Sequence, residues 1–461
     1  MTIVTQKDAW DESELDRAAS LACELRTLAR ADARLIAVRA PGRVNLIGEH
    51  TDYSGLPVLP VAIDRSTIIV AAPTQSRALS LYNSDRSYPQ REFAIETKIP
   101  PYASGDWANY VKAAVQGVID HFAPRGLDIS QIRGARFFID GRVPAAAGLS
   151  SSAALTVSSA LAFMAVNGLA LPAIETATMV ARSEWYVGTM AGGMDQAASL
   201  LGQRDHAVFI EFNPLRARPV KMPRDAAMVV AGSGELADKS GKVRGEYNRR
   251  VVECRLAARL LARQLKLDDV RVLGDVVSRT KDLNASDLVQ ALATAAPERL
   301  NPDLVEAAEL LGVSRDDLAR GLLDDSRIVL DSRPLEILKR ARHVLSETER
   351  VLRAIPALEE GRLDAMGVLM GASHRSLAED FECSTARVDQ MVECARRAGA
   401  TGARLTGAGF GGSIVALCRP GDTERVIAAL DAQYYSPLGI EPKRAFLRAS
   451  PGASVIELAA V

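Results

Sequence analysis

The chain has 461 residues, of which 56 are basic and 57 acidic, so its formal net charge is −1. At roughly 150 residues per domain this length predicts two or three domains, and a hydrophobic content of 48% is ample for buried cores. The near-zero net charge argues against nucleic acid or an anionic membrane surface as the main partner. The five cysteines are widely spaced and odd in number. This pattern favours free thiols in a reducing cytosol over a disulfide framework or a zinc site.

The first third of the chain contains a helix signal and one long uncharged stretch. Up to Glu14 there is no apolar run, which predicts no secretory signal and a cytoplasmic protein. Residues 11–30 alternate charged and aliphatic side chains at helical spacing, which predicts an amphipathic helix. Residues 143–174 carry no charge and are long enough to span a membrane. Because this stretch opens with a proline and a serine-rich turn and is rich in Ala and Ser, it instead favours a buried helix capped by serines.

Residues 41–53 form the most polar motif, Pro-Gly-Arg-Val-Asn-Leu-Ile-Gly-Glu-His-Thr-Asp-Tyr. The apolar segments at 35–38 and 57–63 predict strands on either side, so the motif is expected on the loop that joins them. Such loops commonly carry binding residues on a rigid frame. Its charged and hydroxyl side chains offer donors and acceptors suited to a polyhydroxylated ligand. The alternative is a solvated charged loop without a ligand.

Two glycine-rich segments follow. The turn Gly148-Leu149-Ser150-Ser151-Ser152 opens the predicted helix. Backbone N–H groups and the positive helix end there would bind phosphate, although the same residues could serve only as a helix cap. Glycines 407, 409 and 412 satisfy G-x-G-x-x-G. This segment runs into an apolar stretch at 413–417 that predicts a strand, so a dinucleotide site is not expected.

These motifs resemble the signatures of galactokinases, in the GHMP family of small-molecule kinases. The resemblance rests on residues 41–53, 141–154 and 405–413, and on the segment that begins Gly193-Met194-Asp195-Gln196. It implies an α+β, two-domain GHMP kinase fold with the active site in the interdomain cleft. We expect an N-terminal helix within 1–30, an N-terminal domain at 31–218 and a C-terminal domain at 219–461. The stretch from about 265 to 335 has no counterpart in the resemblance, and the short charged-aliphatic segments at 276–335 predict a helical insertion.

The resemblance also implies roles for individual residues. Asp195 would be the catalytic base, paired with Arg43, which would stabilise charge on the transferred phosphoryl group. The residues implied in sugar binding are Glu49, His50, Asp52, Gly192 and Tyr247. Those implied in binding ATP and its phosphates are Gly148, Leu149, Ser150, Ser151, Ser152, Gly407 and Gly409. Magnesium would be held by Ser151 and Glu184, where an exposed helix acid is the alternative reading of Glu184.

The implied activity is transfer of a phosphoryl group from ATP, with Mg²⁺, to the anomeric hydroxyl of galactose. The chain has Ala146 where the family has glycine, and residues 231–240 depart from the family's pattern. Lys239 in that segment could contact a further polar group on the sugar or be solvated. Alternative substrates are therefore arabinose, N-acetylgalactosamine or a uronic acid, and a catalytically silent sugar and ATP sensor is a further alternative. We expect a monomer or weak oligomer without nucleic-acid or membrane partners.

Overall fold

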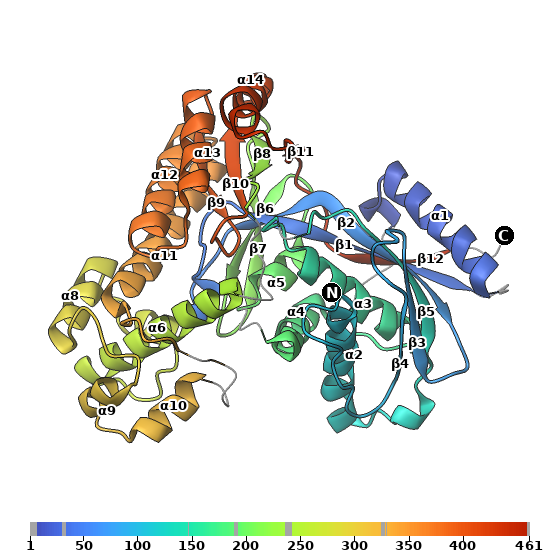
Figure 1. Cartoon of the computed structure of the whole chain (residues 1–461), viewed down its shortest axis with the longest axis horizontal. Coiled ribbons are helices and arrows are strands. Elements are labelled where there is room, and N and C mark those ends of the chain that lie inside the picture. Colours follow the sequence, from blue (N-terminus) through green and yellow to red (C-terminus); the bar gives the residue numbers. More distant parts are fainter. Residues whose placement is uncertain are drawn as a thin grey trace.

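Two sheets and the helices packed on them organise the molecule (Figure 1). The computed structural model describes residues 7–29, 34–145, 147–188, 192–235, 242–323, 328 and 330–458. In this part of the chain, the first sheet has six strands in the order β12-β1-β2-β5-β3-β4, and the second has four in the order β11-β8-β10-β9. A two-stranded hairpin, β6-β7, completes the strands of the described ranges. The α+β two-domain fold expected from the motifs is confirmed.

The elements of the first half mix strands and helices along the chain. Its strands are β1 (Leu35–Asn45), β2 (Pro60–Pro73), β3 (Ala78–Asn83), β4 (Arg91–Ala94), β5 (Ala135–Gly141), β6 (His206–Glu211) and β7 (Arg216–Lys221). Its helices are α1 (Glu12–Ala29), α2 (Ala108–Phe122), α3 (Ser151–Val166), α4 (Ala173–Ser183) and α5 (Met194–Leu201). The N-terminal helix and the uncharged buried helix predicted from the sequence are α1 and α3.

The second half contains more helix. Its strands are β8 (Ala227–Gly232), β9 (Gly402–Thr406), β10 (Ser413–Cys418), β11 (Arg444–Leu447) and β12 (Ser454–Leu458). Its first helices are α6 (Lys242–Gln264), α7 (Leu273–Arg279), α8 (Ala285–Ala295), α9 (Val305–Leu311) and α10 (Arg315–Leu323). The others are α11 (Ile337–Glu359), α12 (Leu363–Glu379), α13 (Ala386–Arg397), α14 (Thr423–Leu430) and α15 (Ser436–Leu438).

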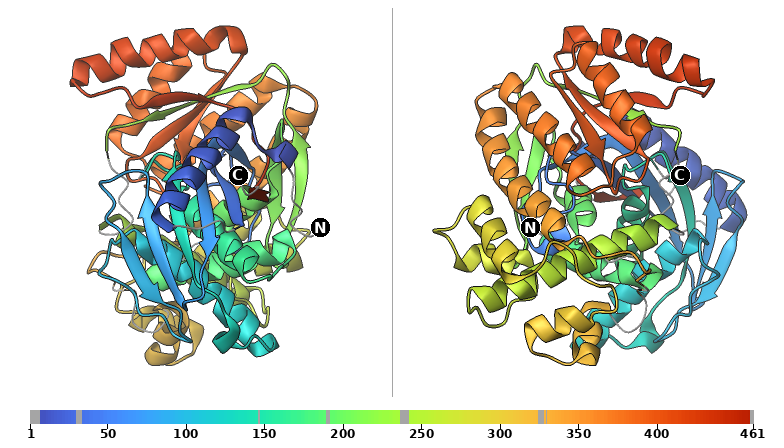
Figure 2. Two further views of the ribbon diagram at one scale, coloured as in Figure 1. Left: turned by 90° about the vertical axis from the view of Figure 1, so that its right-hand side faces the viewer. Right: turned by 60° about the vertical axis from the view of Figure 1, so that its left-hand side comes forward.

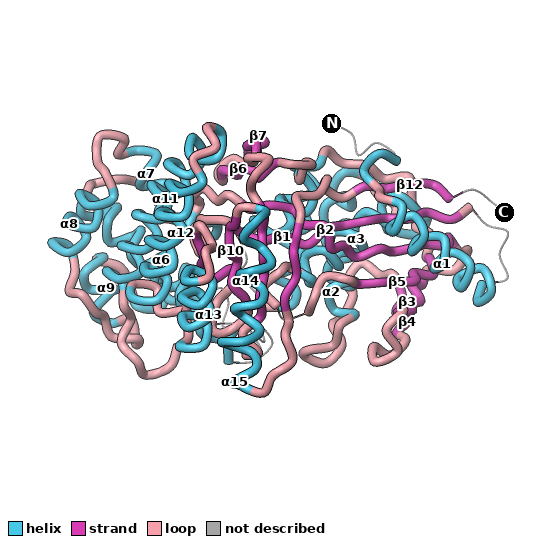
Figure 3. The backbone as a smooth tube through the Cα atoms, turned by 90° about the horizontal axis from the view of Figure 1, so that it is seen from above, coloured by secondary structure: helices cyan, strands magenta, loops and turns pink. Residues whose placement is uncertain are grey.

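The six-stranded sheet is covered on both faces, and its central strands are therefore largely apolar on both sides. Along β1, Leu35 and Ala37 pack with helix α1, whereas Ile36 and Val38 pack on the opposite face with helices α2 and α3. This alternation follows from the two-residue period of a strand. Seen from above, α1 lies over the strands of this sheet, near the labels β12 and β5 (Figure 3), and it contacts β2 and β5.

The strand predicted at 35–38 is longer than expected, and the polar motif begins inside it. Strand β1 continues to Asn45, with a register shift between Pro41 and Arg43, and β2 begins at Pro60. A Pro-Gly pair normally indicates a turn, but here it forms a bulge. Gly42 is needed there, because a Cβ atom would lie 2.5 Å from the Leu149 carbonyl oxygen. The bulge thus brings β1 against the serine-rich turn.

The helices of the second half surround the four-stranded sheet and form a separate lobe. Helices α8, α9 and α10 gather at one end of the molecule, beyond α6 (Figures 1 and 2). Their leucines join the core shared with α6 and α11, including Leu288, Leu292, Leu318 and Leu322. The segment predicted as a helical insertion is therefore helical, and it is anchored by an apolar face.

Strands β7 and β12 each depart from a simple expectation. Proline normally interrupts a strand, yet β7 includes Pro219. β7 pairs with β6 alone in the described sheets, and an edge strand tolerates a residue that lacks an N–H group. The predicted division at residue 218 would also assign β12 to the second domain, whereas its hydrogen-bonded partner is β1.

Helix α1 is attached to the sheet through buried charges, which gives a test of its contribution. The Glu14 carboxylate accepts hydrogen bonds from Arg39 Nε (2.6 Å) and Ser66 Oγ (2.7 Å). The Arg39 side chain is only 2% exposed. Glu14→Ala would leave the buried Arg39 guanidinium without its carboxylate partner, and we expect a loss of about 3–5 kcal/mol in the free energy of unfolding.

Denaturant unfolding of Glu14→Ala beside Glu24→Ala would measure this loss. Glu24 is exposed on the same helix, so its replacement should change stability by less than about 0.5 kcal/mol. Equal losses in the two variants would contradict the buried ion pair as the anchor.

Candidate active site

Arg43 and Asp195, predicted as a pair, are in direct contact. Arg43 Nε and Nη2 lie 2.8 and 2.7 Å from the same carboxylate oxygen, Asp195 Oδ1. Arg43 is on β1 and Asp195 is in the first turn of α5, 152 residues later. The Arg43 side chain is 3% exposed and that of Asp195 16%. Arg43 therefore binds one oxygen of the carboxylate, while part of the Asp195 side chain stays exposed to solvent.

The serine-rich turn lies on the other side of Asp195. Ser150 Oγ donates to Asp195 Oδ2 at 2.6 Å, and Arg43 Nη1 donates to the Gly148 carbonyl at 2.6 Å. Ser150 has a φ of 61° and no side-chain capping bond to helix α3. The prediction that the serines cap the helix by side-chain hydrogen bonds is thus wrong for Ser150, because its hydroxyl is directed at the carboxylate.

The two glycine-rich segments touch one another. The segment with glycines 407, 409 and 412 joins the antiparallel strands β9 and β10. This confirms a glycine loop between strands and rules out the strand-loop-helix arrangement of a dinucleotide site. A Cβ atom on Gly407 would lie 2.8 Å from Gly148 Cα, and one on Gly148 would lie 2.7 Å from the Thr406 carbonyl oxygen. Both glycines have positive φ, at 91° and 71°. Side chains at either position would push the loops apart.

A cavity of about 1090 Å³ lies beside this cluster, lined by residues from both halves of the chain. Asp52 and Gly192 line it from the first half, and Arg255 and Val272 from the second. A Cβ atom on Gly192 would lie 2.6 Å from the Asp52 carboxyl carbon, so the glycine allows the two segments to meet. Burial, followed by the nearby Asp195 charge, raises the pKa of Asp52.

Tyr247 reaches the same region from helix α6. Its ring centroid lies 5.6 Å from that of His50 and 5.5 Å from that of Tyr53. Burial, together with the charges of Asp52 and Asp195, raises its pKa well above the ordinary value. The phenol therefore stays protonated at neutral pH and can donate a hydrogen bond.

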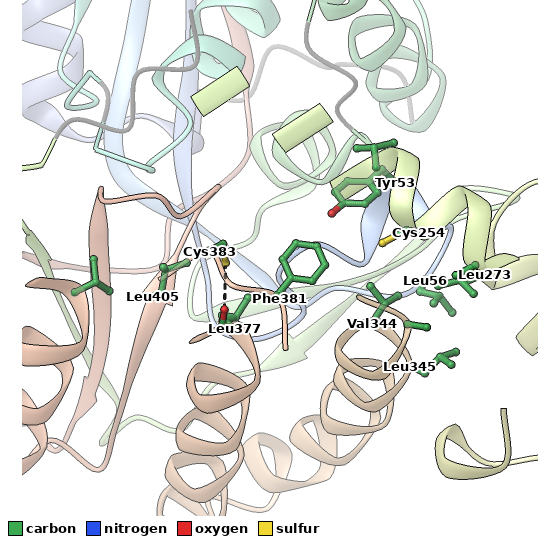
Figure 4. Packing of buried hydrophobic residues seen from close by; sticks show 14 of the residues in the cluster. Tyr53, Leu56, Cys254, Leu273, Val344, Leu345, Leu377, Phe381, Cys383 and Leu405 are labelled. Carbon is green, nitrogen blue, oxygen red and sulfur yellow. Dashed lines mark hydrogen bonds between the residues drawn. The ribbon is translucent and has the colours of Figure 1, made fainter. Parts of the chain in front are cut away.

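Glu49 and His50, also predicted to bind sugar, lie deeper than Asp52. Glu49 accepts hydrogen bonds from Asn45 Nδ2 and from the Gly407 N–H. His50 stacks on Phe381 at a centroid distance of 4.4 Å, with Nδ1 3.0 Å from the Tyr53 hydroxyl. Burial lowers the pKa of His50 well below its usual value, so the ring is neutral. Figure 4 shows Phe381 and Tyr53 among buried hydrophobic residues, on different segments of the chain.

Comparison with known proteins agrees with this geometry. Residues 28–73 match the galactokinase galactose-binding signature, and residues 109–203 and 354–436 match the N-terminal and C-terminal GHMP kinase domains. A galactokinase of Dictyostelium discoideum is 35% identical over 433 residues, covering 86% of this chain and 84% of that protein. The chain belongs to the galactokinase family. It is a sugar kinase of the GHMP fold, and the resemblance seen in its motifs is confirmed.

Solved structures give the same assignment. The crystal structure of Lactococcus lactis galactokinase complexed with galactose matches with a TM-score of 0.75 and 27% identity, covering 95% of this chain and 99% of that one. Mevalonate kinase of Methanococcus jannaschii matches with a TM-score of 0.53 and 18% identity, covering 90% and 98%. The second similarity extends to the fold alone. The shared GHMP architecture thus includes kinases named for other substrates.

Glu184, implied by the galactokinase resemblance as a magnesium ligand, is buried rather than an exposed helix acid. The Thr156 hydroxyl donates to the Ser152 carbonyl at 2.8 Å, and its Oγ1 lies 3.3 Å from Glu184 Oε1. Glu184 is therefore close to the first turn of α3, where Ser151 begins the helix. Ala146 and Lys239, two departures from the family pattern, lie outside the described residues.

Three functional neighbours were missed by the sequence reading: His343 and Glu347 of α11, and Arg404 of β9. His343 Nε2 lies 3.1 Å from the Glu49 carbonyl oxygen, and Glu347 Oε1 accepts from the Gly48 N–H at 2.8 Å. Arg404 Nη1 donates to the Asn45 carbonyl at 3.0 Å. Two sequence signals could have indicated them. His343 and Glu347 are four residues apart on an otherwise apolar helix face, and Arg404 lies within an apolar strand.

Other expectations concern features away from the cleft. All five cysteines are free thiols. Among the described residues, no helix is long and apolar enough to cross a membrane, and no cluster of three or more His, Cys, Asp or Glu side chains could hold a metal. A magnesium site made of hydroxyl and phosphate oxygens with one carboxylate would not form such a cluster.

The buried state of His343 predicts acid sensitivity. Burial lowers the pKa of His343 to about 4 from 6.5, although Glu347 opposes the shift. Between these values the unfolded chain binds a proton that the folded protein does not. The free energy of unfolding should therefore be highest above pH 6.5 and fall by about 3 kcal/mol as pH drops to 4.

Calorimetric unfolding from pH 7.5 to 5 would measure this fall, with His343→Gln for comparison. The glutamine amide can donate to the Glu49 carbonyl but does not titrate, so the variant should show a shallower fall. His374, whose pKa is also lowered to about 4, contributes to both proteins. An identical pH dependence in both would exclude His343 as a source.

Proposed function

We propose that the protein transfers the terminal phosphoryl group of ATP to the anomeric hydroxyl of galactose, giving galactose 1-phosphate and ADP. The observation that carries this proposal is the partly exposed Asp195 carboxylate between Arg43 and Ser150, at the meeting point of both glycine-rich segments. The galactose-binding signature at residues 28–73 and the galactose complex of the Lactococcus enzyme support galactose as the sugar.

Asp195 is the group that accepts the proton of the attacking hydroxyl. The attacking oxygen gains nucleophilicity as its proton moves to the carboxylate and its new bond to phosphorus forms, while the bond to the ADP oxygen breaks. Arg43 holds the carboxylate in place, and it balances negative charge near the transferred group. Gly148 to Ser152, at the positive end of α3, would hold ATP phosphates, with Gly407 and Gly409 closing against them.

The sugar would lie over Asp52, Gly192 and Tyr247, which border the cavity or its rim. Glu49 and His50 stay in the proposed set of sugar-binding residues, and both already have protein partners. Mg²⁺, the usual companion of ATP, would neutralise phosphate charge when bound. The Ser151 hydroxyl and the Glu184 carboxylate supply the hard oxygen ligands that it prefers. Free cysteines suit a cytoplasmic location, and we propose a monomer or weak oligomer.

ADP release with ATP and Mg²⁺ across several sugars tests the substrate. We expect the highest kcat/KM on galactose among galactose, arabinose, N-acetylgalactosamine, galacturonate and glucose. A preference for another of these sugars would replace galactose in the proposal. Absence of turnover on all of them, with galactose and ATP both bound, would favour a silent sensor.

Asp195→Asn tests the base. The amide keeps the side-chain size but cannot accept the proton from the hydroxyl, so kcat should fall about 10²–10⁴-fold, with galactose affinity by calorimetry changed much less. Asp205→Asn is the matched control, because Asp205 is exposed in a turn ten residues later and asparagine tolerates its φ of 61°. Turnover retained in Asp195→Asn would exclude Asp195 as the base.

A further inference from the structure

Residues 46–59, which join β1 to β2 and which we term the sugar loop, lie directly against helix α11. Gly48 has a φ of 100°, and a Cβ atom there would lie 2.9 Å from Val351 Cγ2 of that helix. Backbone groups of two consecutive loop residues are bonded to α11. Glu347 accepts the Gly48 N–H, and His343 contacts the Glu49 carbonyl. Since a carbonyl can only accept, His343 Nε2 carries the hydrogen.

Glu347 is an unusual residue for this position. Its side chain is fully buried, and its helix neighbours Val344 and Val351 are apolar core residues. An isolated buried carboxylate is strongly unfavourable, and an apolar side chain of similar size would satisfy packing alone. Burial opposes its ionisation, yet Arg350 and further neighbours lower the pKa of Glu347 to about 2. The interior is therefore arranged to keep a charge at this point.

The hydrogen bonds of Glu347 indicate the purpose of that charge. Oε1 accepts from the Gly48 N–H at 2.8 Å and from Ser373 Oγ at 2.6 Å, while Oε2 accepts from Arg350 Nε at 2.5 Å. Arg350 of α11 and Ser373 of α12 fix the carboxylate, and Gly48 is its hydrogen-bond partner on the loop. Arg404 lies 4.0 Å from Oε1 and 3.9 Å from Glu49 Oε2, between the two buried carboxylates.

Gly48 lies four residues before Asp52, so the position of Gly48 affects where Asp52 lies at the cavity. Thr51 Oγ1 lies 2.9 Å from the Gly48 carbonyl oxygen and 2.8 Å from that of Pro57, so its hydroxyl joins both ends of the turn that carries Asp52. Asp52 then lines the cavity. Arg43 and Ser150 both hydrogen-bond to Asp195, and the sugar loop meets the phosphate side through Glu49, which accepts from the Gly407 N–H. The phosphate side thus has support of its own besides this contact.

We propose that Glu347 is a positioning residue for the sugar: its carboxylate holds the Gly48 backbone and thereby sets where Asp52 meets the ligand. This inference rests on the proposed function in taking galactose as that ligand. Glu347 acts through the loop and touches neither substrate.

The test compares Glu347→Ala, Glu347→Gln and Glu349→Gln. Loss of a charged hydrogen-bond partner corresponds to about 10–100-fold, and we expect KM for galactose to rise by that factor in Glu347→Ala. KM for ATP should change less than about threefold, since the phosphate loops keep their contacts. Glu347→Gln keeps one acceptor oxygen and should fall between wild type and Glu347→Ala.

Glu349→Gln is the matched control on the same helix. Glu349 also accepts a backbone N–H, from Ala285 at 2.9 Å, but it is exposed and faces the helical lobe. Its replacement should leave both KM values unchanged. Equal rises in both KM values of Glu347→Ala, or a lower Tm with unchanged KM for galactose, would overturn the proposal.

Two further measurements keep the test decisive. If Glu347→Ala does not fold, Glu347→Gln is used alone, with amide hydrogen exchange of peptides covering 46–59. Faster exchange there and weaker galactose binding support the proposal, and unchanged values of both reject it. Galactose affinity is measured by calorimetry without ATP, so a wild-type protein that binds galactose without turnover would refute the proposed reaction while still testing Glu347.

Discussion

The guanidinium of Arg43 is the contact on which the active-site arrangement depends. One end of it meets Asp195 at the start of α5, and the other donates to the Gly148 carbonyl in the serine-rich turn. The backbone N–H of Arg43 also donates to the Leu149 carbonyl oxygen at 3.1 Å. A single residue of β1 therefore fixes the carboxylate and the phosphate-side loop relative to each other. Arginine suits this task because its planar group presents several donors in fixed directions.

The bulge at Gly42 makes that contact possible. A regular strand would alternate its side chains between the two faces of the sheet, so without the register shift Arg43 would point to one of those faces rather than to the serine-rich turn. The register shift between Pro41 and Arg43 turns the strand toward the serine-rich turn at the point where the apolar pattern ends. Bulges commonly redirect a side chain beside an active site in this way.

The sequence was sufficient for the parts of the site whose chemistry is local. The polar motif and both glycine segments were predicted from local pattern, because glycine turns and dense polar motifs are informative within a few residues. The pairing of Arg43 with Asp195 came from the resemblance to galactokinases. The strand limits at 35–38 were too short, since Pro41 and Gly42 have strong turn preferences that sheet pairing overrode. Ser150 was predicted as a cap, and the competing acceptor on Asp195 is 45 residues away.

Contacts between distant segments could not be predicted from a single chain. Gly48 and Glu347 are 299 residues apart, and a glutamate in a helix normally indicates a solvated face. Only the packed structure shows that this carboxylate faces a backbone N–H group and two arginines. The same applies to Arg404, whose neighbours in β9 are apolar.

These long-range contacts give the two halves of the molecule different tasks. The first half supplies Arg43, Ser150 and Asp195, while α11 and β9 of the second half hold the loop that carries Glu49, His50 and Asp52. Phosphoryl transfer depends on placing the attacking oxygen in line with phosphorus, and small displacements reduce the rate strongly. A sugar loop supported only by its own turns would sample several positions. Buried charges are costly to maintain, but they fix direction in a way that apolar packing does not. The ionised interior between α11, β9 and the sugar loop is therefore best understood as the means by which one half of the kinase orients the sugar for the other.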